Sequence, residues 1–100
     1  MSKSLYLVSY FDRDDGQNYQ LIVTDTYENA VKYVKYDFEG ELLPNDRLAR
    51  NLVLENVDGD WSVKDPDAEE TEFFDSQLVG DYNIEHIELY EGSDIDELLK

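Results

Sequence analysis

Few side chains in this sequence are suited to covalent or acid–base chemistry. Cysteine is absent, so the chain has no thiolate nucleophile, disulfide or cysteine-based metal site. His86 is the single histidine, and neither Ser76 nor Ser93 belongs to a G-x-S-x-G turn. A lone histidine without an oriented partner is more often structural than catalytic. We therefore expect no enzyme activity, no catalytic residue and no cofactor.

Carboxylates are abundant, and paired carboxylates serve glycoside hydrolysis and metal-ion catalysis. With 25 acidic residues among 100, however, pairs arise by chance at any chosen spacing. The run 12–16 resembles the start of an EF-hand loop, but Gly16 comes one place early and Val23 stands where the loop needs glutamate. The sequence also lacks a G-x-G-x-x-G motif and a P-loop. It predicts no dedicated metal or nucleotide site.

Negative charge is the strongest signal in the composition. The chain has 25 acidic and eight basic residues, a net charge of −17. Residues 1–50 hold nine acids and six bases, whereas residues 51–100 hold sixteen acids and two bases. A net charge of about 2–8 is enough to keep a small domain in solution, so the excess points to a function. Nucleic acids and anionic membranes are excluded as direct partners, because binding them requires clustered lysine and arginine.

A long acidic stretch without a base runs from Asp65 to Glu91. Carboxylates arranged along one face approach a short ladder of phosphates and would dock into the basic groove of a DNA- or RNA-handling protein. Nearby aromatic side chains would supply anchors. The predicted partner-binding residues are Asp65, Asp67, Glu69, Glu70, Glu72, Asp75, Asp81, Glu85, Glu88, Glu91, Phe73, Phe74 and Tyr90.

Three classes of function fit this pattern. The first is a nucleic-acid mimic that inhibits a DNA- or RNA-handling protein, of the anti-CRISPR or anti-restriction kind typical of phages and mobile elements. The second is an immunity protein that neutralises a basic nuclease toxin. The third is a non-catalytic accessory domain whose charge is incidental, as it would be if the acids only coat a solvated surface. The sequence does not decide whether the chain forms a homodimer. Without an apolar signal-peptide core or membrane span, a cytoplasmic location is expected.

Alternating and apolar patterns predict strands over residues 4–11, 18–24, 51–57, 60–64 and 82–91. A slip in alternation near His86 and Ile87 indicates a bulge in the last strand. Asp58-Gly59 predicts a two-residue hairpin turn that sets Asn56 opposite Trp61.

A helix is predicted to begin after a cap at Asp25 or Thr26 and to end before Gly40. Residues 65–79 fit either a second helix or an acidic loop. Residues 93–100 fit a frayed tail or a short helix capped by Ser93. The whole chain, residues 1–100, thus reads as a single acidic α+β domain. We expect an antiparallel or mixed sheet of about five strands, with one or two helices packed on one face.

Overall fold

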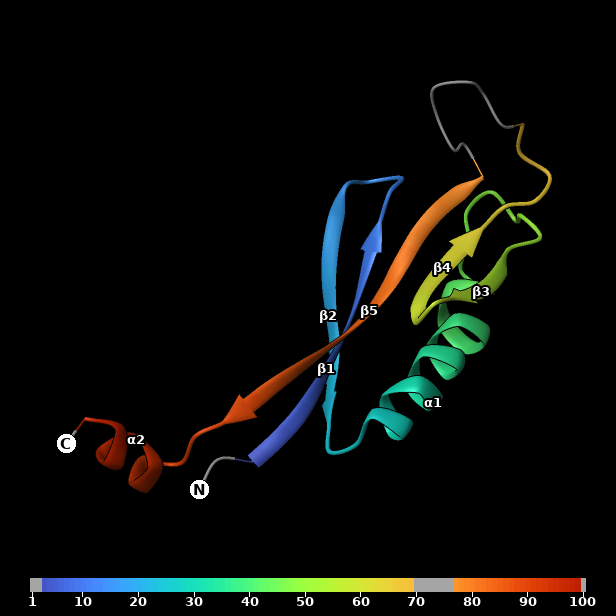
Figure 1. The fold of residues 1–100 in the computed structure, drawn as a ribbon. Coiled ribbons are helices and arrows are strands. Elements are labelled where there is room, and N and C mark those ends of the chain that lie inside the picture. The colour runs from blue at the N-terminus through green and yellow to red at the C-terminus, as the bar shows by residue number, and fades with distance from the viewer. Residues whose placement is uncertain (1–2, 70–76, 100) are drawn as a thin grey trace.

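The computed structural model describes residues 3–69 and 77–99. Its five strands form one antiparallel sheet in the order β2-β1-β5-β4-β3, which confirms the α+β class (Figure 1). The elements are β1 (Lys3–Asp12), β2 (Gln17–Thr24), α1 (Tyr27–Asp37), the π-helix η1 (Phe38–Leu42), β3 (Val53–Val57), β4 (Asp60–Lys64), β5 (Leu78–Leu89) and α2 (Gly92–Leu98).

The hairpin between β3 and β4 follows from its turn residues. Asp58 and Gly59 both have positive φ angles, 53° and 88°, which a two-residue turn of type I′ requires. Asn56 lies opposite Trp61, as the sequence predicts. The hairpin therefore turns the side chain of Trp61 into the core, where it is 9% exposed.

The main helix packs on one face of the sheet through an apolar stripe. Thr26 is its N-cap and accepts a hydrogen bond from the Asn29 amide at 3.1 Å. Ala30 and Val34 are fully buried. The predicted end before Gly40 is wrong, because the helix continues through Gly40 as η1. The buried Phe38 accepts an i+5 hydrogen bond from the Leu43 amide at 2.9 Å.

The core beneath α1 contains alternate residues of the neighbouring strands β1 and β5. Val8 and Tyr10 from β1 and Tyr82 from β5 are at most 5% exposed, and the two tyrosine rings lie 4.7 Å apart between centroids. Gly80 makes room for this arrangement, since a Cβ at that position would overlap the hydroxyl of Tyr10. The end of the Tyr10 ring therefore points along β1 towards Asp12, the residue paired with Gly80.

The structure contradicts the predicted bulge in β5 and excludes one of the two alternatives for residues 65–79. The pairing of β5 with β1 is regular through His86 and Ile87, so no bulge occurs there; the irregularity lies where β5 meets β4, next to Val63. The structure excludes a helix that spans residues 65–79, because neither end of this range is helical. Residues 66–68 form turns and a bend, and β5 already begins at Leu78. The middle of that segment, residues 70–76, lies outside the described residues.

The molecule has two parts, which Figure 1 separates clearly. The body is the sheet with α1 and η1, and the arm is made of residues 3–5 and 87–99, the free ends of β1 and β5 with α2. A short terminal helix is confirmed, but Glu91, not Ser93, is its N-cap. In Figure 1, α2 stands away from the sheet. The radius of gyration is 16.9 Å, against about 13 Å for a compact chain of this length.

Candidate functional site

Five of the predicted partner-binding residues lie outside the described residues. They belong to the segment between β4 and β5 and comprise both predicted phenylalanine anchors and three of the predicted acids. These residues are Glu70, Glu72, Phe73, Phe74 and Asp75.

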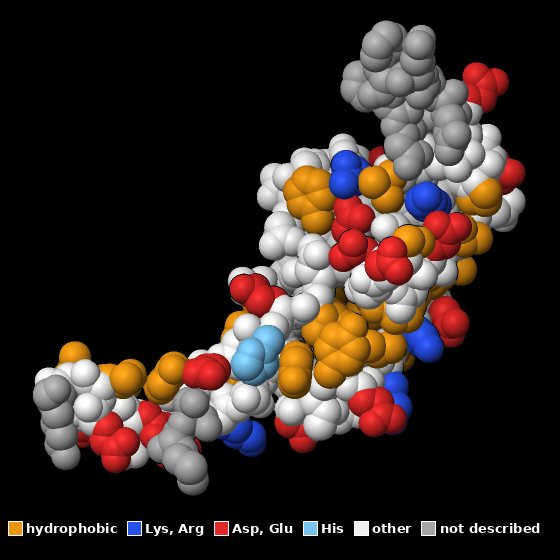
Figure 2. Space-filling model, in the orientation of Figure 1, with side chains coloured by type: hydrophobic (Ala, Val, Ile, Leu, Met, Phe, Trp, Pro, Cys, Tyr) orange, Lys and Arg blue, Asp and Glu red, His pale blue; other side chains and the backbone are white. Residues whose placement is uncertain are grey.

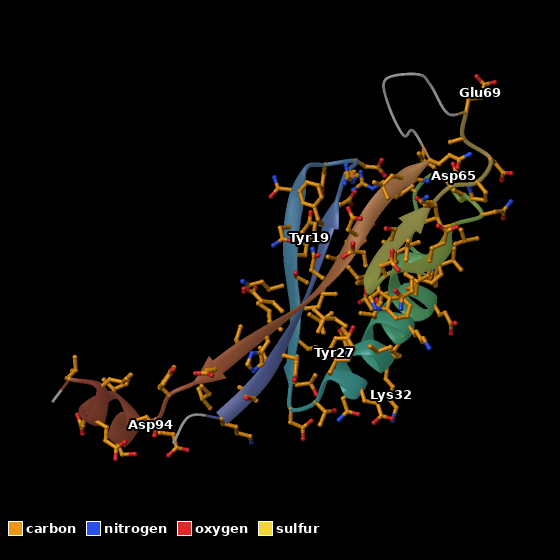
Figure 3. The ribbon with its side chains drawn as sticks, in the orientation of Figure 1. Tyr19, Tyr27, Lys32, Asp65, Glu69 and Asp94 are labelled. Carbon is orange, nitrogen blue, oxygen red and sulfur yellow. The ribbon has the colours of Figure 1, made fainter. Side chains whose placement is uncertain are left out.

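Three of the predicted acids lie just after β4, at the end of the molecule opposite α2. Figure 3 shows Asp65 and Glu69 at that end and Asp94 of α2 at the other. Asp65 accepts a hydrogen bond from the Asp67 amide at 3.1 Å, an Asx-turn around Pro66. The Asp65 amide in turn donates to the carbonyl of Gln77 at 2.7 Å, so this acidic turn is joined to the start of β5.

The remaining four predicted acids follow β5 towards the arm. Asp81 and Glu85 alternate with Tyr82 and so lie on the sheet face opposite α1, whereas Glu88 lies on the other face and Glu91 follows the strand. The structure therefore does not gather the described acids into one patch. It distributes them along the long axis, and we call this set the acidic track: Asp65, Asp67, Glu69, Asp81, Glu85, Glu88 and Glu91.

Among the described residues of the acidic track, Asp81 alone is paired with a lysine or arginine. Asp81 is paired with Arg13 at 3.1 Å and also accepts a hydrogen bond from Ser62. Among the described residues, no lysine or arginine forms an ion pair with Glu85, Glu88 or Glu91, and all three are exposed. Acidic side chains are visible on both the body and the arm in Figure 2.

The last predicted anchor, Tyr90, lies at the junction between β5 and α2. Its ring is 42% exposed, and its hydroxyl donates a hydrogen bond to the carboxylate of Glu88. Tyr90 therefore presents an aromatic face beside a carboxylate of the acidic track. His86 lies on the preceding strand, exposed, with its ring 5.4 Å from that of Tyr6 between centroids.

A second acidic site, which the sequence analysis did not predict, is a cavity of about 750 Å³ on the body. It opens between the β1–β2 turn, the end of the η1 helix and the connection to β3. Leucine and valine side chains form its apolar part. Its acidic lining residues are Asp12, Asp14, Asp15, Asp37, Glu41 and Asp46, and its basic ones are Arg47 and Arg50.

Arg50 organises one wall of this cavity. Its guanidinium donates to Asp46 at 2.8 Å and to Asp14 of the β1–β2 turn at 2.8 Å, so it joins two segments distant in sequence. Hydrogen bonds from Arg50 lower the pKa of Asp46 to about 2, and the same bonds raise the pKa of Arg50. The positive charge of Arg50 is therefore already shared between two carboxylates.

Asp37, at the end of α1, also lines the cavity and is joined to the core. Asp37 accepts a hydrogen bond from the hydroxyl of Tyr82 at 2.7 Å. Burial, together with this hydrogen bond, raises the pKa of Tyr82, so the hydroxyl stays protonated and donates. Glu41, one helical turn further on, also lines the cavity. In the part of the chain that is described, neither carboxylate is paired with a lysine or arginine.

Comparison of the chain with protein-family models, curated proteins and solved structures gives no match. Within residues 3–69 and 77–99, no three histidine or acidic side chains converge in a geometry that would hold a metal ion. No helix of the same residues is long and apolar enough to cross a membrane.

The cavity carboxylates were overlooked because they belong to the half of the chain with little net charge. In the sequence, Asp12, Asp14 and Asp15 stand out only as an incomplete EF-hand-like run. Glu41 lies beyond the predicted end of the helix that contains Asp37, so the sequence does not bring these two carboxylates together. It also does not show that both meet the turn of a distant hairpin.

Proposed function

We propose that this chain is a non-catalytic acidic inhibitor that occupies the nucleic-acid groove of a basic DNA- or RNA-handling protein in the cytoplasm. It would act as counter-defence proteins of phages and mobile elements do, by taking the place of the nucleic acid. Its target would be a nuclease or another nucleic-acid-binding protein.

The observation that carries this proposal is the combination of length and charge. The principal axes of the molecule measure 57 × 29 × 24 Å, and the net charge is −17. Dividing 57 Å by 17 gives one net negative charge per about 3.4 Å. A nucleic-acid strand in a duplex carries one phosphate charge per about 3.4 Å of axis. The mean charge density along the molecule thus matches that of one strand.

The arm is the part best suited to enter a groove. It is narrow, because only β1 and β5 continue into it. Its acids Glu88 and Glu91, and Glu85 just before it on β5, are exposed without a basic partner among the described residues. Uncompensated carboxylates attract a basic groove over a distance of roughly 10 Å at moderate salt. Tyr90 would add an aromatic contact beside them.

The test begins with capture of the partner from a lysate of the source organism at low salt, followed by elution in salt steps. The captured protein is then bound to a labelled DNA or RNA duplex, and the chain is titrated as a competitor. We expect displacement of the duplex, with an affinity that falls steeply as salt rises. A captured partner that binds no nucleic acid, or that binds the duplex and the chain together, would contradict the proposal.

A matched pair of variants separates position from total charge. The triple change Glu85→Lys, Glu88→Lys and Glu91→Lys should weaken competition by more than about tenfold. The control changes three other exposed acids, Glu28, Glu39 and Asp60, to lysine and alters the net charge by the same amount. We expect it to lose less than about threefold. An equal loss of competition in the two triple variants would show that net charge alone explains binding, and it would contradict a role for the acidic track.

A further inference from the structure

We propose that the cavity on the body binds an organic cation with an aliphatic stem, an alkylammonium or alkylguanidinium group. Two sources present this chemistry: a free polyamine, and the lysine or arginine side chain of a protein partner. The cavity shares no residue with the acidic track, so this inference does not depend on the function proposed above.

The charge of the lining favours a cation. Six carboxylates and two arginines line the cavity. Arg50 is committed to Asp14 and Asp46. The carboxylates of Asp37 and Glu41 have no basic partner among the described residues. Two negative charges on the helix side are thus available to a ligand, and the concave shape of the site concentrates their field on it.

The apolar lining favours an aliphatic stem over a bare ion. Leu42, Leu52 and Val79 line the cavity together with the carboxylates. Leu52 is 6% exposed and Val79 is 5% exposed, so they present only a small apolar surface to a ligand. Methylene groups cover such a surface while their charged end stays at the acidic rim, as the side chains of lysine and arginine do. Inorganic cations cannot make both contacts.

Tyr10 gives an independent indication of a ligand. Its side chain is 5% exposed and lines the cavity, and its hydroxyl has no hydrogen-bond partner among the described residues. The contact with Gly80 directs this hydroxyl towards Asp12, at the cavity end of β1. Trp61, which contributes the other unpartnered polar atom of the described part, does not line the cavity.

A buried hydroxyl without a partner is costly, and natural proteins retain few of them. The oxygen of Tyr10 accepts a hydrogen bond from an N–H donor, and burial raises the pKa of the phenol, so it is protonated and neutral at pH 7. An ammonium or guanidinium group bound in the cavity that Tyr10 lines supplies such a donor.

The experiment follows the backbone amides of the full chain, labelled with ¹⁵N, during titration with spermidine and, separately, with Nα-acetyl-arginine amide. We expect saturable shifts confined to residues 12–16 and 41–52 with at least one probe. Saturation by spermidine alone assigns the site to a free polyamine, and saturation by the arginine derivative alone assigns it to a partner side chain. Shifts spread over the arm, or equal shifts with Mg²⁺, would overturn the inference as general charge screening.

Two substitutions test the residues. Glu41→Gln should weaken binding of the active probe by about tenfold, while Glu39→Gln, on the same π-helix but outside the cavity lining, should change it by less than about twofold. Tyr10→Phe keeps the ring and removes the hydroxyl. It should weaken binding severalfold while the melting temperature of the free protein stays the same or rises. Unchanged binding in both Glu41→Gln and Tyr10→Phe would overturn the site.

Discussion

The neighbouring strands β1 and β5 pass through both the body and the arm, and the two parts differ in what covers these strands. In the body, β1 and β5 carry Val8, Tyr10 and Tyr82, which are buried beneath α1. In the arm the same two strands continue to pair regularly as far as Lys3 and Leu89, which lie opposite each other, but Leu89 is 48% exposed. Backbone pairing is therefore continuous, whereas burial of apolar surface stops.

This difference shows which interactions stabilise each part. Backbone hydrogen bonds contribute modestly to net stability, because the backbone groups of the unfolded chain form hydrogen bonds with water instead. Buried apolar area is the larger favourable contribution, and the body holds nearly all of it. We expect the body to determine the stability of the fold and the arm to be available for contacts with a partner. Three predictions test this division, in order of decreasing effect.

The largest difference in stability is expected between alanine substitutions of one leucine in the body and one leucine in the arm. Leu52 is 6% exposed in the body and Leu98 is 67% exposed on α2. Leu52→Ala should lower the free energy of unfolding by about 2–4 kcal/mol, because it leaves a cavity in the core. Leu98→Ala should change it by less than about 0.5 kcal/mol. Urea unfolding measures both, and a comparable loss for the two variants would mean that α2 is packed as firmly as the body.

The second prediction concerns the ion pair between Asp46 and Arg50. The side chain of Asp46 is 6% exposed. The pKa of Asp46 falls from 3.8 to about 2 on folding, chiefly through hydrogen bonds from Arg50. A lowered pKa means that folding favours the charged form. Ionised Asp46 therefore contributes about 2 kcal/mol to the free energy of unfolding above pH 3.8, and this contribution is lost as the pH falls through 2.

Asp46→Asn should consequently cost about 2 kcal/mol at pH 7 and much less at pH 2. Asp96→Asn on the arm is the matched control, and it should change stability by less than about 0.5 kcal/mol at either pH. Thermal unfolding across this pH range distinguishes the two variants. A cost for Asp46→Asn that does not vary with pH would show that the ion pair is not its source.

The smallest effect comes from removing one tyrosine hydroxyl in each part. Tyr82 donates to Asp37 at 2.7 Å and is 2% exposed, whereas Tyr90 donates to Glu88 at the surface. Tyr82→Phe should cost about 1–2 kcal/mol, because a partly buried carboxylate loses its donor, and Tyr90→Phe should cost almost nothing. Equal changes in the urea midpoint would argue that the Tyr82 hydrogen bond is as well solvated as the surface one.

Local signals in the sequence predict the elements of the body well. The hairpin at Asp58-Gly59 and the start of the helix after a cap at Asp25 or Thr26 depend on residues a few positions apart. The end of the helix was mispredicted at Gly40 because burial of Phe38 outweighed the local preference of glycine to end a helix.

The candidate sites were harder to predict, because they depend on contacts between distant residues. The acidic excess of residues 65–91 is a property of composition, but its course along a 57 Å molecule depends on β5 extending beyond the sheet. The cavity requires the β1–β2 turn, the π-helix and Arg50 to meet. No local pattern contains that information.

The sequence alone thus determined the sign and size of the charge, the type of most elements and the α+β class. These properties follow from residue types and from short periods of two and 3.6 residues. Only the tertiary structure decided which carboxylates are neutralised by arginine, which line a cavity and which stay exposed on the arm. These outcomes depend on distances between side chains that are tens of residues apart in the chain, such as Asp14 and Arg50.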